Sequence, residues 1–233
     1  MLVPIPALND NYIWLYGREN LPIIVIDLPE TTGLLAYLKQ HQLKVEALLL
    51  THYHDDHTAG VAHFKQVFPD VKIFGPEETR ARGATDIIQA GKFHTENYEI
   101  EVLDTAGHTE QHVSYVIEGH LFCGDSLFSA GCGRVFTGDY AKMYEGIQRL
   151  KQLPQETLVC PAHEYTLSNL AFAQSVLGEN PFLKAYYQHV VELRAANRPS
   201  LPTTLALEQQ INPFLQATSL EQFIQLRQAK DRF

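Results

Sequence analysis

Short apolar runs alternate with polar turns and amphipathic stretches through the first part of the chain. Residues 23–26 and 47–50 are uninterrupted apolar runs that stop at polar residues, which is the pattern of buried strands. Between them, residues 31–42 carry leucines at helical spacing. The same pattern predicts further helices at 58–68 and 140–153, and strands at 71–74, 100–103, 112–117, 120–123 and 157–160. This alternation predicts an α/β domain.

The pattern changes near residue 165. The amphipathic stretches that follow, with no persuasive strand between them, are residues 169–177, 182–197 and 219–230. Residues 178–181, Gly-Glu-Asn-Pro, separate the first two. We therefore predict an α/β domain over residues 1–165 and a small helical domain over residues 166–233. A segment this short should pack on the first domain rather than swing freely.

The composition narrows the class of protein. With 45% hydrophobic residues the chain can build a sizeable core, and it lacks the run of about eighteen apolar residues that a membrane span needs. Residues 1–6 lack the features of a signal peptide, so we expect a cytoplasmic protein without a membrane partner. A net charge of −9 argues against a nucleic-acid partner. The three cysteines form no C-x-x-C pair, which argues against a disulfide framework.

The eleven histidines are the unusual feature of the composition, and three of them fall within residues 52–57, His-Tyr-His-Asp-Asp-His. His52 and His54 are two positions apart, so an extended chain can point both toward one ion. Asp56 and His57, where a helix should start, can face a second ion. A solvated loop explains one exposed histidine, but five such side chains after a buried strand favour a metal site. Imidazole with carboxylate suits zinc, iron or manganese better than calcium or magnesium.

Two coordination shells need more ligands, and three candidates, His108, Asp125 and His163, follow later apolar runs. Each has small or turn-forming neighbours that would let a metal approach, and the two oxygens of Asp125 could bridge two ions. Cys132 lies near them in the sequence; a buried small side chain is its commoner role, and a reactive thiol the alternative. The remaining histidines are expected to be structural or exposed, with His112 closest to the site: His41, His63, His94, His112, His120 and His189.

The pattern Thr51-His52-x-His54-x-Asp56-His57, completed by these three residues, resembles the metallo-β-lactamase superfamily. Within that superfamily the chain is most similar to the glyoxalase II (hydroxyacylglutathione hydrolase) family, nearly from end to end. The segments that carry the likeness are residues 9–14, 124–128, 131–134, 163–166 and 169–170, and most specifically the ending Arg227-x-x-Lys230-Asp231-x-Phe233. The resemblance implies an α/β fold, the αββα sandwich of the superfamily, with a small C-terminal helical domain that binds glutathione. It also implies a monomer.

The resemblance implies a role for each matching residue. His52, His54 and His108 would hold one metal ion. Asp56, His57 and His163 would hold a second ion, and Asp125 would bridge the two. The side chains that would contact glutathione are Arg134, Phe136, Tyr165, Arg227 and Lys230. Zinc is the first expectation for both divalent ions, with iron or manganese as alternatives.

The chain departs from the family's pattern at four positions. Tyr53 stands where many members carry another histidine, although that position is not a ligand. Ala106 and Gln111 replace a common proline and glycine near His108, and could alter that loop. Phe136 replaces a tyrosine found in some members, which removes one potential hydroxyl contact to the substrate.

The function implied by the resemblance is hydrolysis of S-(2-hydroxyacyl)glutathione thioesters, such as S-D-lactoylglutathione to D-lactate and glutathione, in methylglyoxal detoxification. A hydroxide bridging two metal ions would attack the carbonyl carbon, and one metal would stabilise the oxyanion. Our hypothesis gives Asp56 a second role, orienting that hydroxide. Arg227 and Lys230, one helical turn apart, would meet the carboxylates of glutathione. An isolated pair of this kind is more often a solvated helix end.

Two other functions stay open. A mononuclear iron sulfur (persulfide) dioxygenase of the same fold would need only one ion, and metal content with oxygen uptake on a persulfide would distinguish it. A non-catalytic metal-binding module would keep the ligands without activity. The complete set of candidate ligands and the helical tail favour the hydrolase.

Overall fold

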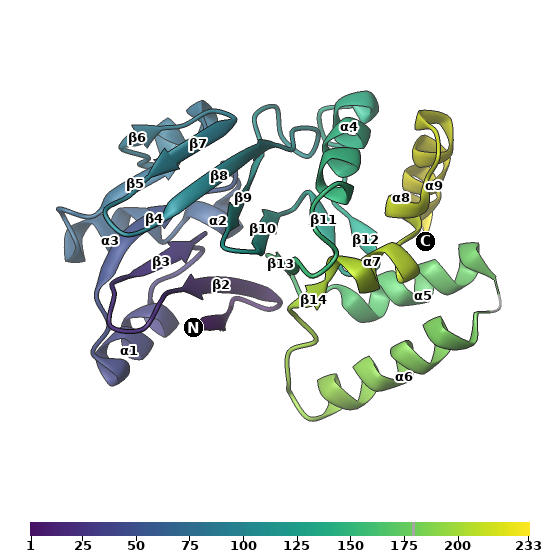
Figure 1. Cartoon of the computed structure of the whole chain (residues 1–233), viewed down its shortest axis with the longest axis horizontal. Helices are drawn as coiled ribbons and strands as arrows, with labels where there is room; N and C mark the ends of the chain where they lie inside the picture. The colour runs from purple at the N-terminus through teal and green to yellow at the C-terminus, as the bar shows by residue number, and fades with distance from the viewer. Residues whose placement is uncertain (179) are drawn as a thin grey trace.

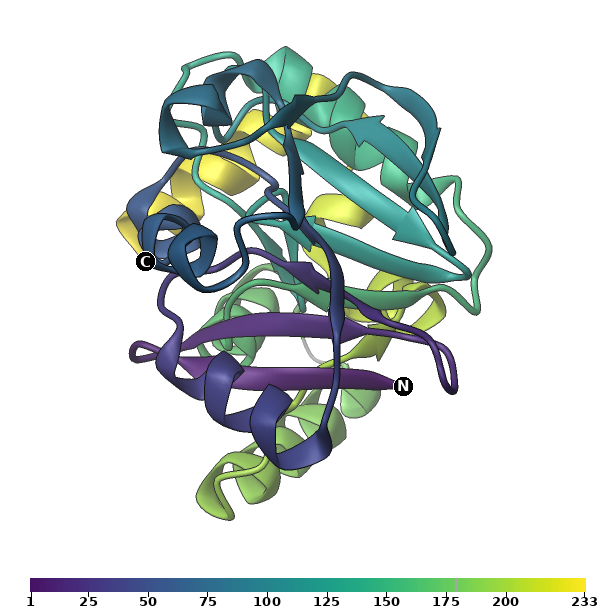
Figure 2. The same cartoon turned by 90° about the vertical axis from the view of Figure 1, so that its left-hand side faces the viewer.

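Two six-stranded sheets form the centre of the molecule in the computed structural model, which describes residues 1–178 and 180–233 (Figures 1 and 2). Glu179, part of the predicted break at residues 178–181, lies outside the described residues. The first sheet has the order β1 (Leu2–Ala7), β2 (Asn11–Tyr16), β3 (Ile23–Ile26), β4 (Val45–Leu49), β5 (Lys72–Gly75) and β6 (Asp86–Ile87). The second has the order β14 (Thr203–Thr204), β13 (Leu158–Pro161), β10 (His120–Gly124), β9 (Val113–Ile117), β8 (Glu99–Asp104) and β7 (Gly91–His94). A separate ribbon pairs β11 (Leu127–Phe128) with β12 (Gly131–Cys132).

Helices cover the outer face of each sheet, so the predicted αββα sandwich is confirmed. The first part of the chain contributes α1 (Thr32–His41), α2 (Asp55–Thr58), α3 (Val61–Val67), the 3₁₀ helix η1 (Glu77–Arg82) and α4 (Tyr140–Lys151). The tail contributes α5 (Thr166–Leu177), α6 (Pro181–Ala195), α7 (Leu205–Ile211), α8 (Pro213–Gln216) and α9 (Leu220–Arg232). Figure 1 shows the tail helices gathered at the opposite side of the molecule from α1. In the described part of the chain, no helix is long and apolar enough to cross a membrane.

The alternation of side chains along β3 shows how the layers are held. Ile24 and Ile26 point between the two sheets and join a core that includes Phe122 of the second sheet. Ile23 and Val25 point the other way and pack with side chains of α1 and α3. Because both faces of the strand are covered, every position is apolar, which is why the sequence pattern located β3 correctly.

Two predictions from the sequence need correction. The helix expected at residues 58–68 starts later, as α3 at Val61, because α2 ends at Thr58 and the chain then turns at Gly60 to pass close to the first sheet. A Cβ at Gly60 would lie 2.9 Å from the carbonyl oxygen of Leu28, so only glycine fits. The tail, expected to lack strands, contains β14, which pairs antiparallel with β13 and joins the tail to the second sheet. A strand of two residues is too short to show any periodicity.

Candidate metal centre

Strand ends of the two sheets carry the seven candidate ligands to one place. His52 and His54 follow β4, and Asp56 and His57 lie in the short helix α2, which begins at Asp55. The other three follow later strands: His108 after β8, Asp125 after β10 and His163 after β13. Their ligand atoms form three overlapping groups, within each of which all atoms lie within 4.8 Å of one another: His52, His54 and His108; His52, His57 and Asp125; and Asp56, His57 and His163. The structure therefore brings together all seven residues.

Asp125 lies between the groups and turns a different oxygen toward each side. Its Oδ2 is 3.4 Å from Nε2 of His108. Its Oδ1 is 3.3 Å from Nε2 of His57 and 3.3 Å from Nε2 of His163. On the second side, Oδ2 of Asp56 adds a further carboxylate oxygen, 3.4 Å from Nε2 of His163. Asp125 thus presents one carboxylate oxygen to each side of the cluster.

The donor set fits divalent metal ions. Nδ1 of His54 is 3.0 Å from Nε2 of His52 and 3.1 Å from Nε2 of His108, so three ring nitrogens converge. Nε2 of His57 and Oδ1 of Asp125 are buried and have no hydrogen-bond partner among the described residues. Buried polar atoms are nearly always paired, and a cation would satisfy both. Mixed imidazole and carboxylate ligands suit zinc, iron or manganese.

The electrostatics of the cluster favour positive charge at its centre. The hydrogen bond with His163 lowers the pKa of Asp56 to about 2. Burial opposes ionisation of Asp125, but the neighbouring imidazoles outweigh it and hold its pKa well below the ordinary value. Burial would also lower the pKa of His57, yet the carboxylates of Asp125 and Asp27 raise that pKa well above its ordinary value. Ionised carboxylates therefore surround the place where a cation would bind.

Residues that we did not single out from the sequence hold the ligand rings from behind. Oδ2 of Asp27 lies 2.8 Å from Nδ1 of His57 and accepts a hydrogen bond from the hydroxyl of Thr51 at 2.8 Å, while Oδ1 accepts one from the amide of Thr51 at 2.8 Å. Oδ1 of Asp10 lies 2.8 Å from Nδ1 of His163. Such partners decide which ring nitrogen faces a metal. Asp27 directly follows β3, which runs parallel to β4, so its position after a buried strand could have revealed it.

Two further contacts set the His108 side of the cluster. Nδ1 of His108 lies 2.8 Å from the carbonyl oxygen of Arg134, which leaves Nε2 to face the other ligands. His112 is fully buried and accepts a hydrogen bond at Nε2 from the amide of Asp125, at 3.1 Å. His112 therefore supports a ligand without belonging to the three groups.

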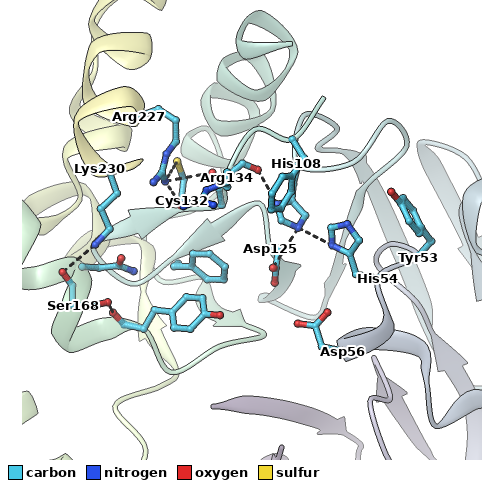
Figure 3. A pocket seen from close by; sticks show the side chains of 15 residues that line it. Tyr53, His54, Asp56, His108, Asp125, Cys132, Arg134, Ser168, Arg227 and Lys230 are labelled. Atoms are coloured by element: carbon cyan, nitrogen blue, oxygen red, sulfur yellow. Dashed lines mark hydrogen bonds and ion pairs between the residues drawn. The ribbon is translucent and has the colours of Figure 1, made fainter. Parts of the chain in front are cut away.

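A cavity of about 740 Å³ joins the ligand cluster to the helical tail (Figure 3). This is the size of a small-molecule site. Figure 3 shows Arg227 and Lys230, both from α9, at one end of the cavity, Asp125 and His54 further along, and Tyr53 at the other end. The arrangement places positive side chains, candidate metal ligands and an aromatic ring in that order.

The two cations of α9 already hydrogen-bond to the protein. Arg227 is only 5% exposed; its Nη1 donates to the carbonyl oxygen of Cys132 at 2.6 Å, and its Nη2 to Asp231 at 3.0 Å. Nζ of Lys230 donates to the carbonyl oxygen of Ser168 at 3.1 Å. Burial raises the pKa of the Cys132 thiol to about 11, which favours a buried small side chain over a reactive thiolate.

The other predicted substrate contacts line the same cavity. Nε of Arg134 lies 3.3 Å from Oδ1 of Asp231, so this guanidinium belongs to the charged end. Phe136 is 63% exposed, which is high for an aromatic ring. The Tyr165 ring stacks on His163 with centroids 4.6 Å apart. Burial raises the pKa of Tyr165, so its hydroxyl stays neutral.

Two family models match adjacent parts of the chain, the metallo-beta-lactamase superfamily over residues 17–163 and the hydroxyacylglutathione hydrolase C-terminus over residues 164–233. A curated relative from Actinobacillus pleuropneumoniae serotype 5b (strain L20), named hydroxyacylglutathione hydrolase, is 47% identical over 234 residues, covering 100% of this chain and 99% of the relative. One of the same name from Glaesserella parasuis serovar 5 (strain SH0165) is 46% identical over 233 residues, with the same coverage. The chain belongs to the hydroxyacylglutathione hydrolase family.

Membership of the hydroxyacylglutathione hydrolase family makes the chain a hydrolase of the metallo-β-lactamase superfamily, as the sequence motifs predicted. The fold agrees. The crystal structure of ETHE1 from Myxococcus xanthus superposes with a TM-score of 0.74 and 22% identity, covering 98% of this chain and 90% of that chain. At this identity the likeness shows the fold alone.

The C-terminal segment of this hydroxyacylglutathione hydrolase family member also supports one wall of the cavity, residues 127–132. Glu208 of α7 is fully buried and accepts a hydrogen bond from the amide of Ala130 at 2.8 Å. Asn212 donates to two carbonyl oxygens of the same wall, at 3.0 and 2.9 Å, and Asn169 donates to a third at 3.1 Å. The tail therefore positions backbone near the ligand cluster as well as supplying cations.

Proposed function

We propose that this protein hydrolyses S-(2-hydroxyacyl)glutathione thioesters, with S-D-lactoylglutathione, which would give D-lactate and glutathione, as the first substrate to test. One observation carries the proposal: a single cavity joins convergent metal-ligand side chains to an end that holds Arg227 and Lys230. The ligand cluster suits hydrolysis, and the cations suit a tripeptide that carries carboxylates. The names of the relatives at 46% and 47% identity support the same substrate class.

In this proposal the centre holds two divalent ions, with zinc before iron or manganese. His52, His54 and His108 would hold one ion, Asp56, His57 and His163 the other, and Asp125 would contact both. The division is supported by the close groups of ligand atoms, two of which have these memberships. When bound, such ions lower the pKa of water toward about 7 and stabilise negative charge on a carbonyl oxygen.

Asp56 has the geometry for orienting the attacking water. Its side chain is 42% exposed, whereas that of Asp125 is 10% exposed, so Asp56 is the ligand carboxylate that is more open to the cavity. With a pKa of about 2 it is ionised, and one oxygen can accept a hydrogen bond from water while the other faces His163. This acceptor would direct the lone pair of the water at the thioester carbon. The glutathione thiolate, from a thiol of pKa about 8.5, leaves without a strong acid beside it.

The charged end would hold glutathione through its carboxylates. Lys230 is the more adaptable donor, because its ammonium group has three N–H bonds and donates one of them to Ser168. Nε of Arg227 is buried and has no hydrogen-bond partner among the described residues, so this guanidinium retains donor capacity. Asp231 pairs with Arg227 and with Arg134, which moderates their charge. A negative ligand would therefore rely most on Lys230.

The decisive experiment combines metal analysis with thioester hydrolysis. We expect the metallated protein to contain two ions per chain and to hydrolyse S-D-lactoylglutathione. Activity should disappear on chelation and return on adding zinc, iron or manganese. A fully metallated protein that leaves glutathione thioesters intact would overturn the proposal. One ion per chain, with oxygen uptake on a persulfide, would instead indicate the dioxygenase. We also propose a monomer, which light scattering in solution would test; a cytoplasmic location stays a prediction.

A further inference from the structure

The two ends of the cavity differ in chemistry. One end is charged and polar, with Arg227 and Lys230 beside the Ser168 carbonyl group. Tyr53 lies at the other end, beyond the candidate ligands, as Figure 3 shows. Tyr53 is 39% exposed, and Phe136, which also lines the cavity, is 63% exposed. Large apolar surface left uncovered inside a cavity is typical of a ligand contact.

Contacts of both its ring and its backbone position Tyr53 at this end of the cavity. The ring packs edge-on against the ring of His54, with centroids 4.9 Å apart. Its carbonyl oxygen accepts a hydrogen bond from the hydroxyl of Thr58 at 3.3 Å, and its amide donates to the Glu78 carboxylate. Glu78 exchanges two hydrogen bonds with Gln111, at 2.9 and 3.0 Å. The loop that carries Tyr53 is thereby tied to the loop that follows His108.

The order of groups along the cavity decides where each half of a thioester lies. Glutathione is attached through the sulfur atom, and the acyl group lies on the opposite side of the carbonyl carbon. When the carbonyl group is at the ligand cluster and the glutathione carboxylates point to Arg227 and Lys230, the acyl group points away from α9. It then extends toward Tyr53. A short acyl chain stops near the ligands, whereas a branched or aromatic chain reaches the ring.

We infer that Tyr53 determines specificity for the acyl group. Its ring is the wall against which that group packs, and it favours 2-hydroxyacyl groups with an apolar, above all an aromatic, substituent. This inference rests on the proposed function and adds the part of the substrate that the charged end does not contact. The ring packs on His54 and takes no part in the chemical step, so its contribution to the acyl group is to binding, which appears in KM rather than in kcat.

The test uses the full chain, reconstituted with metal, and three substrates that differ only in the acyl group: S-acetylglutathione, S-D-lactoylglutathione and S-D-mandeloylglutathione. We expect Tyr53→Ala to raise KM for the mandeloyl thioester by about threefold to tenfold, the range that one aromatic pair provides, with kcat little changed. The acetyl and lactoyl thioesters should change less than about twofold. Tyr53→Phe, which keeps the ring, should match the wild type on all three.

A control variant separates this effect from damage to the fold, and the thermal unfolding transition of Tyr53→Ala should match that of the wild type. Phe182→Ala removes another exposed ring, on α6, which does not line the cavity, and should leave all three substrates unaffected. An equal loss on all three substrates with Tyr53→Ala would overturn the inference and show that the ring merely supports His54. A lower KM for the mandeloyl thioester in Tyr53→Ala would also overturn the inference, since the ring would then be an obstacle. A wild type that hydrolyses the lactoyl thioester but not the mandeloyl thioester would overturn it too. If the metallated wild type hydrolyses none of the three, the proposed function itself fails.

Discussion

The ligand cluster and the charged end of the cavity differ in how their polar groups are paired. In the cluster, the rings of His52 and His57 are fully buried, and their outer nitrogens face Thr51 and Asp27 at 3.0 and 2.8 Å. The inner Nε2 of His57 has no hydrogen-bond partner among the described residues. At the charged end, the side chain of Arg227 already donates to backbone carbonyl and carboxylate oxygens of the protein.

This difference teaches how catalysis and recognition are divided in one cavity. In the cluster, ring nitrogens and carboxylate oxygens converge on one point, some of them without hydrogen-bond partners among the described residues. Each of these atoms has one position, so a substitution that removes one should greatly reduce activity. The charged end offers several donors that already hydrogen-bond to the protein without substrate. A ligand therefore gains from each donor only the difference in free energy between the new hydrogen bond and the one it replaces. Substitutions should therefore have large effects in the cluster, intermediate effects behind it and small effects at the charged end.

Asp125→Asn should have the largest effect. The amide keeps the shape of the side chain but removes the negative charge that lies between the groups of ligands. Losing that charge should cost several kcal/mol of transition-state stabilisation. We expect kcat/KM for S-D-lactoylglutathione to fall by about a thousandfold or more. Steady-state kinetics with metal analysis would measure this, and an unchanged circular dichroism spectrum is the control. Activity within about tenfold of the wild type would contradict the central position of Asp125.

Asp27→Asn should reduce metal affinity or activity by about tenfold to a hundredfold, because Asp27 orients His57 without being a ligand. The φ angle of Asp27 is +54°, which asparagine tolerates well, so the substitution changes charge with little change in backbone. Competition with a chelator would measure metal affinity, and activity would be compared at saturating metal. Wild-type metal affinity and activity in this variant would show that His57 needs no partner behind it.

Lys230→Ala should raise KM for S-D-lactoylglutathione by about tenfold, the cost of one charge-assisted hydrogen bond, and leave kcat nearly unchanged. A simple thioester without the glutathione carboxylates should be unaffected. Lys184→Ala, which removes an exposed cation on α6 outside the cavity, is the matched control for net charge. If both lysine variants raise KM equally, or if both substrates respond equally, the charged end is not a binding site.

Glu208→Ala should act mainly on stability. It leaves the amide of Ala130 and the hydroxyl of Thr203 without their acceptor, which should lower the free energy of unfolding by about 1–3 kcal/mol. Chemical denaturation would measure this free energy. Wild-type stability in the variant would show that the wall at residues 127–132 does not depend on the tail.

Glu208→Gln separates charge from shape at the same position. Because burial raises the pKa of Glu208, the folded state holds its proton at a pH where the unfolded chain has lost it. The free energy of unfolding of the wild type should therefore fall, relative to Glu208→Gln, as pH rises through this titration. A constant difference between pH values of about 5 and 8 would contradict the shift.

Elements buried on both faces or on one clear stripe were predictable from the sequence. The run at residues 23–26 coincides with β3, and the amphipathic stretch at 140–153 contains α4. β14 was missed because two residues carry no pattern, and its place beside β13 depends on where the tail crosses the second sheet. The separation of α2 from α3 depends on the approach of Gly60 to the Leu28 carbonyl group, which is a tertiary contact.

The sequence by itself determined the chemistry of the cluster, because His52, His54, Asp56 and His57 lie within six consecutive positions and stay in one short segment in any fold. It also marked His108, Asp125 and His163 as strand ends. Only the tertiary structure decided that those ends meet, that Asp27 reaches His57 from 30 positions away, and that Arg227 is buried against Cys132, 95 positions away. Such contacts depend on the order of strands in the sheets and on how the tail packs, and no local pattern in the chain records either of these.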